Sequence, residues 1–262
     1  MRRLLPVLLA SLLPGCGCEP VPDAGAVPPK RTALAAPAAS LPATPARPAA
    51  PVPPPRPELA PVPTAPGGAD MTLDSFDGKA GEAPKGWRSG SGRWLLSEDA
   101  SAARGPSVLK QDQETQPWAV LLKDGVYAGD LSLQARFKPV SGREDASGGL
   151  ILRAQDAENY LLCRANSLEG NFRLYAVKDG RRETLESADV QAPELGTWHT
   201  LQMSVAGDTV TCGLDGKTLL TRRLDASAWA KGRVGLWTKA DSVTEFDDVQ
   251  IVRVPATPGG KP

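Results

Sequence analysis

The sequence is poor in histidine, in clustered positive charge and in long apolar runs, and each shortage excludes a class of protein. His199 is the only histidine, which excludes a zinc site built from several histidines. Lysine plus arginine and aspartate plus glutamate are balanced at 30 each. No basic cluster stands out, so nucleic acid is not an expected partner. Glycine-rich phosphate loops, CxxC pairs and amphipathic helices are also lacking.

The N-terminal 18 residues have the pattern of an export signal. Arg2 and Arg3 precede an apolar run over residues 4–13. This run is about half of the roughly 20 residues that a membrane-spanning helix needs, so a signal peptide fits better than an anchor. No later segment is long and apolar enough to span a bilayer.

A cysteine follows this apolar run in a motif that points to lipidation. Leu13-Pro14-Gly15-Cys16 resembles the bacterial lipobox, in which the cysteine is lipidated and becomes the new N-terminus. We expect lipidation of Cys16; ordinary cleavage nearby and use of Cys18 remain the alternatives. Acyl chains would hold the protein to a membrane, since each buried CH₂ contributes roughly 0.8 kcal/mol. Because Gly17 stands where an aspartate usually retains lipoproteins in the inner membrane, the outer membrane is the expected location.

Residues 19–68 have the composition of a tether and cannot form a core. They hold 16 of the 26 prolines, few charges and no aromatic residue. Such a segment is expected to be disordered and to sample polyproline II, which at ~3.1 Å per residue could reach on the order of 150 Å. It would then serve as a spacer, and the alternative is a passive linker.

Residues 69–256 predict one all-β domain, followed by a disordered tail at 257–262. Residues 131–138 alternate apolar and polar side chains, the period-two pattern of a half-buried strand. Glycines beside Asp or Lys mark tight hairpin turns. Many short strands without a helical stripe favour a two-sheet antiparallel β-sandwich. Further strands are expected near 149–155, 159–166, 171–178, 181–187, 198–206, 208–214, 217–223, 232–238 and 243–254.

A series of short motifs across residues 73–254 resembles a known family. In order, they are Phe76-Asp77-Gly78, Pro84-Lys85-Gly86-Trp87, Trp94, Gly149-Leu150-Ile151-Leu152-Arg153-Ala154-Gln155-Asp156, Asn159-Tyr160, Arg164-Ala165-Asn166, Asn171-Phe172-Arg173-Leu174-Tyr175, Trp198-His199, Gly232-Arg233-Val234-Gly235-Leu236-Trp237 and Phe246-Asp247-Asp248. Their order is similar to the 3-keto-disaccharide hydrolase domains, which have a concanavalin-A-like jelly roll. The resemblance implies this fold; it implies activity less strongly, since the architecture serves lectins, binding modules and hydrolases alike.

Strand alternation predicts a ligand-binding band on one sheet face. The strands expected near 149–155, 159–166 and 171–178 are neighbours. If their apolar residues point inward, the polar and aromatic side chains that alternate with them share the opposite face. Sugars offer hydroxyls for Arg and Asn and C–H faces for aromatic rings, and the alternative is a solvated face with paired arginines. Asp156 and Asn159 at strand ends could hold ligand hydroxyls or simply bond their own turns. The complete candidate set is Arg153, Asp156, Asn159, Tyr160, Arg164, Asn166, Arg173, Tyr175, Trp237 and Lys239.

Acids near the C-terminus suggest two further sites. Alternation puts Glu245 and Asp247 on one face, where two carboxylates could form a catalytic pair, and Asp248 with Phe246 on the other. These acids could instead hold a structural calcium near Asp77, Asp247 and Asp248. A third alternative is that they only form hydrogen bonds to the N-terminal strand. No other cofactor is expected. The Glu-x-Asp-x-x-Glu spacing typical of related glucanases is absent, which weakens transfer of conventional glucanase activity.

The remaining residues leave structural and functional alternatives open. Cys163 and Cys212 could form a disulfide in an oxidising envelope or remain buried thiols. His199 alternates with inward-facing residues and is expected to be a core or rim histidine. Three functions follow: a monomeric, lipid-anchored carbohydrate-binding module in the cell envelope, a glycosidase or lyase that acts on (3-keto) disaccharides, and an adhesive or structural surface protein. The first is preferred.

Overall fold

The computed structural model describes residues 70–225 and 227–253, and these form an antiparallel β-sandwich. The predicted signal peptide, Cys16, the linker at 19–68 and the tail at 257–262 lie outside the described residues. The predicted all-β sandwich is confirmed. No helix long and apolar enough to cross a membrane occurs among the described residues.

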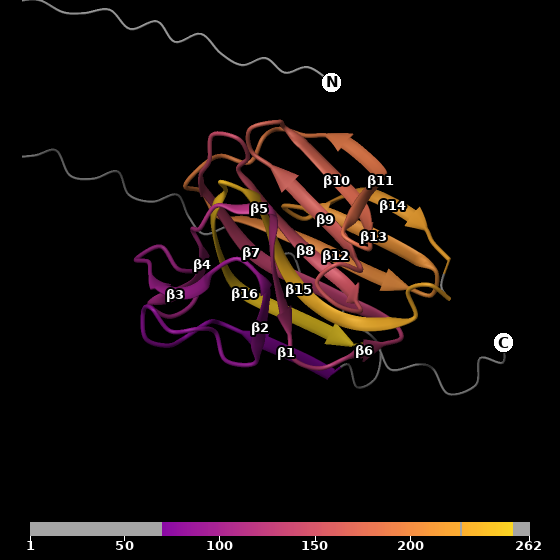
Figure 1. The fold of residues 1–262 in the computed structure, drawn as a ribbon, viewed down its shortest axis with the longest axis horizontal. Helices are drawn as coiled ribbons and strands as arrows, with labels where there is room; N and C mark the ends of the chain where they lie inside the picture. Colours follow the sequence, from indigo (N-terminus) through magenta and orange to yellow (C-terminus); the bar gives the residue numbers. More distant parts are fainter. Residues whose placement is uncertain (1–69, 226, 254–262) are drawn as a thin grey trace, which may run out of the picture. The chain divides into compact units, whose positions relative to one another are not determined.

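Sixteen strands build two sheets (Figure 1). Sheet A has the order β14-β13-β12-β7-β16-β4-β3, with β1 also paired to β16. Sheet B has the order β11-β10-β9-β8-β15-β5-β2, with β6 paired to β15. The strands are β1 (Asp70–Asp74), β2 (Trp87–Ser91), β3 (Trp94–Glu98), β4 (Ser107–Gln111), β5 (Thr115–Lys123), β6 (Tyr127–Ala128), β7 (Leu131–Ser141), β8 (Ser147–Ala154), β9 (Tyr160–Asn166), β10 (Asn171–Lys178), β11 (Arg181–Asp189), β12 (His199–Ala206), β13 (Thr209–Leu214), β14 (Lys217–Arg223), β15 (Lys231–Ala240) and β16 (Val243–Arg253).

The core between the sheets follows the predicted alternation. Along β8, β9 and β10 the apolar residues that were expected to point inward all join one buried cluster with residues of sheet A. Gly148 marks the inward side of β8, because a Cβ there would lie 2.7 Å from Cδ2 of Phe137. The inward set on these strands is Leu150, Leu152, Leu161, Cys163, Ala165, Phe172, Leu174 and Ala176.

A disulfide links the two sheets. Cys163 of β9 and Cys212 of β13 are bonded, with 6.2 Å between their Cα atoms and a sequence separation of 49. Both side chains are fully buried in the core. The bridge therefore joins β9 of sheet B to β13 of sheet A.

Strands β1 to β6 were missed by the sequence analysis. β5 contains Trp118-Ala119-Val120-Leu121-Leu122, in which Ala119 and Leu121 face the core while Val120 and Leu122 face outward. A strand that is apolar on both faces shows no period-two alternation, so its pattern is hidden. β5 nevertheless lies inside sheet B, next to β15.

Candidate functional site

The outer face of sheet B carries a second apolar cluster, separate from the core. It is built around large aromatic side chains from β5, β9, β10 and β15. The Trp237 indole nitrogen donates a hydrogen bond to the Tyr160 hydroxyl (3.2 Å), and the ring centroids of Trp118 and Trp237 lie 6.1 Å apart. The members are Val120, Leu122, Ile151, Ala154, Tyr160, Leu162, Tyr175, Val177 and Trp237, with Trp118 and Ala157 packed against them.

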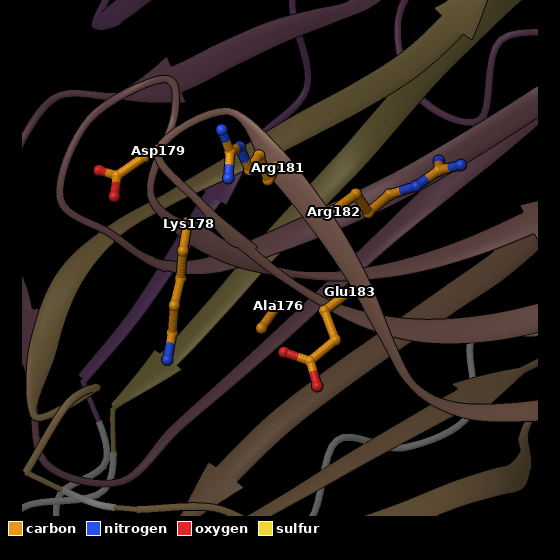
Figure 2. Close-up of a pocket in the computed structure, with 6 residues that line it drawn as sticks. All are labelled: Ala176, Lys178, Asp179, Arg181, Arg182 and Glu183. Atoms are coloured by element: carbon orange, nitrogen blue, oxygen red, sulfur yellow. The ribbon is translucent and has the colours of Figure 1, made fainter.

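One arginine covers this aromatic cluster. The guanidinium carbon of Arg182 on the edge strand β11 lies 4.4 Å from the ring centroid of Tyr175, 5.6 Å from that of Trp118 and 5.8 Å from that of Trp237. Figure 2 shows Arg182 extending away from Lys178 and Glu183 of the same hairpin. The described residues give Arg182 no carboxylate partner, and its Nη1 is buried without a hydrogen bond. The rings share one face, as predicted, but Arg182 and the neighbouring side chains shield them from solvent.

Charged residues form a network at one end of the same face. Arg164 donates to Oδ1 of Asn171 (2.5 Å) and to Oε2 of Glu169 (3.0 Å). Its Nη1 lies 3.6 Å from Oδ2 of the fully buried Asp145, which also accepts from Nζ of Lys239 at 2.8 Å. Arg173 lies at the rim, 4.0 Å from Glu169. Arg164 is therefore a buried, paired arginine, whereas Lys239, Glu169 and Arg173 are partly exposed.

Glu169 is held in its charged form by this network. Its carboxylate accepts a hydrogen bond from the Asn171 amide (2.8 Å), and this bond together with Arg164 and Arg173 lowers the pKa of Glu169 despite partial burial. A carboxylate with a lowered pKa is a weak proton acceptor at neutral pH. Glu169 thus fits the binding of hydroxyl donors better than the removal of a proton.

Several buried polar atoms at this end have no hydrogen-bond partner among the described residues. They are Oδ1 of Asp145, Oγ of Ser147, Nε of Arg164 and Nδ2 of Asn166. Ser147 and Asn166 are direct cross-strand partners on β8 and β9, on the same face as Arg164. Since buried polar groups in proteins are nearly always paired, donors and acceptors left free side by side indicate a place where a ligand or water bonds.

A family model agrees with this architecture. The model described as a 3-keto-alpha-glucoside-1,2-lyase-like domain matches residues 73–252. The chain belongs to this family. The match spans the whole sandwich, including both sheets and the face covered by Arg182. No curated protein matches the sequence.

Solved structures similar to this 3-keto-alpha-glucoside-1,2-lyase-like domain share its fold. The carbohydrate binding module CBM66 from Bacillus subtilis superposes with a TM-score of 0.53 at 16% identity, over 63% of this chain and 94% of that one. Lectin II from Ulex europaeus gives 0.52 at 9% identity, over 71% and 98%. The exoplasmic/lumenal domain of VIP36 in its Ca²⁺/Man-bound form gives 0.50 at 10% identity, over 73% and 92%. At these identities the likeness shows a lectin-like jelly roll and nothing finer.

Three of the predicted ligand-binding residues do not lie in the shared band. Arg153 has a φ of 58° at an irregularity between β8 and β15, and its guanidinium donates to the carbonyl oxygens of Tyr127 and Gly129. It therefore anchors the loop at β6, because the irregularity turns it out of the alternation. Asp156 accepts from the Asn159 amide (3.0 Å), and Asn159 accepts from the backbone N–H of Asp179 (3.0 Å). Asp156 therefore bonds within its own turn, and Asn159 joins that turn to the turn between β10 and β11.

The other predicted residues of the band share the outer face of sheet B. Asn166 pairs with Ser147 and Asn171 across the strands. Its Oδ1 accepts the backbone N–H groups of Leu168 and Glu169, while its Nδ2 is free. The structure thus brings together Tyr160, Arg164, Asn166, Arg173, Tyr175, Trp237 and Lys239.

The predicted catalytic acids lie on the opposite side of the sandwich, on the outer face of sheet A. Glu245 is paired with Lys138 (2.7 Å) and Lys110 (3.4 Å). Asp247 accepts the backbone N–H of Arg104 (2.8 Å), and its burial raises its pKa to about 6. Asp247 thus holds the segment 99–106 onto sheet A, Glu245 pairs with lysines of β4 and β7, and neither acid faces the aromatic cluster of sheet B.

Asp248 was expected on the face opposite Asp247, but both contact Arg104. Asp248 has a φ of 46° at a register shift in β16, and its Oδ1 accepts from Nε of Arg104 at 2.8 Å. The irregularity inserts an extra residue, so alternation fails at this point. No group of three or more metal-ligating side chains occurs in the described ranges, and Asp77 bonds Ser75 (2.8 Å). A calcium ion near these acids stays a prediction.

His199 and Trp198 have structural partners. Nδ1 of His199 lies 2.8 Å from Oδ2 of Asp215, and its ring packs on Phe137, as expected of a rim histidine. Trp198 points the other way, where its indole nitrogen donates to Oγ of Ser101 (3.1 Å). Neither residue reaches the face with the free polar atoms.

The sequence analysis missed four residues of this face: Trp118, Asp145, Ser147 and Arg182. Arg182 alternates with Arg181 and Glu183 on a strand that was predicted, so its placement beside Tyr175 follows from the register of β10 and β11. A signal for it was therefore available in the strand assignment. Asp145 precedes β8 in a loop, and nothing in its sequence neighbourhood indicates burial.

Proposed function

We propose that the domain binds carbohydrate on the outer face of sheet B. The main support for this proposal is a group of buried polar atoms that lack a partner in the described residues and lie beside the aromatic cluster. They belong to Asp145, Ser147, Arg164 and Asn166. A sugar presents hydroxyls that both donate and accept, together with apolar C–H faces. The free carboxylate oxygen accepts, the guanidinium and amide nitrogens donate, and the serine hydroxyl does either.

Binding to the rings requires Arg182 to move. Only cation–π contacts hold its guanidinium, and such contacts are worth about 0.5–2 kcal/mol. β11 is an edge strand, so the side chain has open solvent beside it. A ligand ring that stacks on Trp118 and Trp237 would displace Arg182 and gain its free Nη1 as a donor.

Ser147→Ala tests this proposal with little risk to the fold. The Ser147 hydroxyl has no partner in the described part of the chain, so its removal should leave the free energy of unfolding unchanged. We expect the affinity for a glycan selected on an array to fall by about tenfold, measured by isothermal titration calorimetry. Ser97→Ala on β3 of sheet A is the matched control and should bind as the wild type does. No glycan binding by the folded wild-type protein at millimolar concentration, or equal binding by Ser147→Ala, would refute the site.

We further propose that this domain is displayed on the cell envelope by a lipid on Cys16 and the proline-rich segment at 19–68. The lipobox-like Leu13-Pro14-Gly15-Cys16 and the composition of that segment support this. Cys16→Ser should move the protein from the membrane fraction to the soluble fraction. An unchanged distribution would remove the lipid anchor from the proposal.

A second candidate function is lyase activity on 3-keto-glucosides, and family membership favours it. A 1,2-lyase must remove the proton on C2, which the neighbouring ketone acidifies, and release the group on C1. The acids of the sheet B face suit this poorly, because Glu169 has a lowered pKa and Asp145 is buried between Arg164 and Lys239. Binding is therefore the preferred function.

Incubation with a 3-keto-glucoside separates the two candidates. Turnover by the wild type that is lost in Glu169→Gln, with glycan affinity retained, would establish a lyase. Glu245→Gln and Asp247→Asn test the acids of sheet A in the same assay. Absence of turnover in the wild type, with binding present, leaves the binding module.

A further inference from the structure

A hollow of about 360 Å³ lies on the outer face of sheet A, away from the proposed site on sheet B. Its lining comes from β7, β12, β13, β14 and β16. Among the described residues that line it, Asp130 is the only charged one, and its Oδ1 accepts the backbone N–H of Gly207 at 2.8 Å. The polar side chains of the lining are Ser132, Gln134, Gln202, Ser204, Thr211 and Thr218.

Strand register arranges these side chains in two adjacent rows. Gln134 is the cross-strand partner of Gln202, and Gln202 is the partner of Gly213. In the next row, Ser132 is the partner of Ser204, which is the partner of Thr211. Residues two apart on a strand share a face, so the amide row and the hydroxyl row run side by side across the sheet.

Gly213 continues the amide row and leaves space in the hollow because it has no side chain. It occupies the place next to Gln202 where any other residue would raise a side chain into the hollow. A Cβ at Gly213 would lie 3.2 Å from Oε1 of Gln202 and 2.7 Å from the carbonyl oxygen of Lys217. The register shift between Cys212 and Gly213 places this bare stretch of backbone in the middle of the lining.

Gln134 supplies a donor that nothing in the described chain uses. Its side chain is 2% exposed, and its Oε1 accepts a hydrogen bond from Nε2 of Gln202 (2.8 Å). This bond orients the amide of Gln134, whose own Nε2 is buried without a partner. A buried, oriented and unpaired amide donor in the wall of a hollow is typical of a ligand subsite.

We propose that this hollow is a second binding site, specific for a neutral oligosaccharide. A lining of amides and hydroxyls matches the donors and acceptors of a polyol, and its one charged side chain, Asp130, is bonded to the Gly207 backbone and offers an anionic ligand no counter-ion. Val252 at one end provides an apolar contact for a C–H face. This site shares no residue with the face of sheet B, so a test of one site does not decide the other.

Titration of the full-length protein with maltohexaose, cellohexaose and laminarihexaose, followed by amide NMR, tests the proposal. We expect at least one of these probes to shift the resonances of β7, β12 and β13. Gln202→Ala should weaken that probe by about tenfold, since it removes one lining amide and frees the orientation of Gln134. Gln202 is only half-buried, so this variant should fold, which thermal unfolding checks.

Ser97→Ala on β3, a strand that belongs to neither proposed site, is the matched control and should leave the affinity of that probe unchanged. Gln134→Leu is the second variant, because it removes the free donor; the Gln202 amide, which loses its acceptor, is half-buried and can bond water instead. Shifts confined to sheet B, equal affinity in Gln202→Ala and the wild type, or no binding of any of the three probes at millimolar concentration would each overturn the proposal.

Discussion

The two outer faces of the sandwich follow the same strand alternation, yet they differ in what covers them. On sheet B, the aromatic rings of Trp118, Tyr175 and Trp237 lie beneath Arg182, and Arg164 bridges Asp145 and Glu169. On sheet A, short hydroxyls and amides surround a hollow floored by Gly213. Alternation decides which side chains share a face. Their length and their partners decide whether that face is closed or open.

The largest expected effect concerns the buried charges of sheet B. Arg164→Leu should lower the free energy of unfolding by about 3–5 kcal/mol, because it leaves the buried carboxylate of Asp145 without its arginine. Urea denaturation measures this. Arg173→Leu on the same face is the control and should cost less than about 1 kcal/mol, since Arg173 is at the rim. Equal losses in the two variants would mean that burial does not distinguish the arginines.

Sheet A also buries charged side chains, among them Asp247 beneath the segment 99–106. Burial, with the neighbouring Asp248, raises its pKa from 3.8 to about 6 in the folded protein. The unfolded chain therefore loses this proton at lower pH than the folded protein, and stability from this group falls as pH rises from about 4 to about 6. The fall should be about 2–3 kcal/mol relative to Asp247→Asn, measured by denaturation across this pH range. Parallel pH profiles for the two proteins would contradict the prediction.

Gly149→Ala tests how closely the sheet B face is packed. An added Cβ would lie 2.6 Å from Cδ1 of Leu162 and 2.9 Å from the carbonyl oxygen of Cys163, which is backbone and cannot turn aside. We expect a loss of about 1–3 kcal/mol in thermal unfolding experiments. Ser132→Ala, on the open face of sheet A, should change stability by less than about 0.5 kcal/mol. A neutral Gly149→Ala would show that the face of sheet B is as loosely packed as that of sheet A.

Arg182→Ala should have the smallest effect on stability, but it should clearly change the quenching of tryptophan fluorescence. Loss of its cation–π contacts should cost about 0.5–1 kcal/mol. Trp118 and Trp237 should become accessible, which acrylamide quenching of tryptophan fluorescence detects. Arg181→Ala on the same hairpin is the control. Unchanged quenching in Arg182→Ala would mean that side chains other than Arg182 close the face.

The strands from β7 onward were predicted to within a few residues, whereas β1 to β6 were not. Period-two alternation is visible where one face is apolar and the other polar, as in residues 131–138. The sequence of β5 shows no alternation because both faces of the strand are buried. The two residues of β6 are too few to form a pattern. The register shifts at Arg153 and Asp248 could not be predicted either, since no residue pattern in either segment indicates them.

By itself, the sequence determined the fold class, the family and the side of each central strand, because these depend on local periodicity and on the order of short motifs. Tertiary structure alone decided that Arg182 covers the rings, that Asp247 holds a loop on the far sheet, and that Gly213 lies in the lining of a hollow. Each of those outcomes depends on which strands become neighbours and in what register. Contacts between residues far apart in the chain are therefore what separates a covered face from an open one.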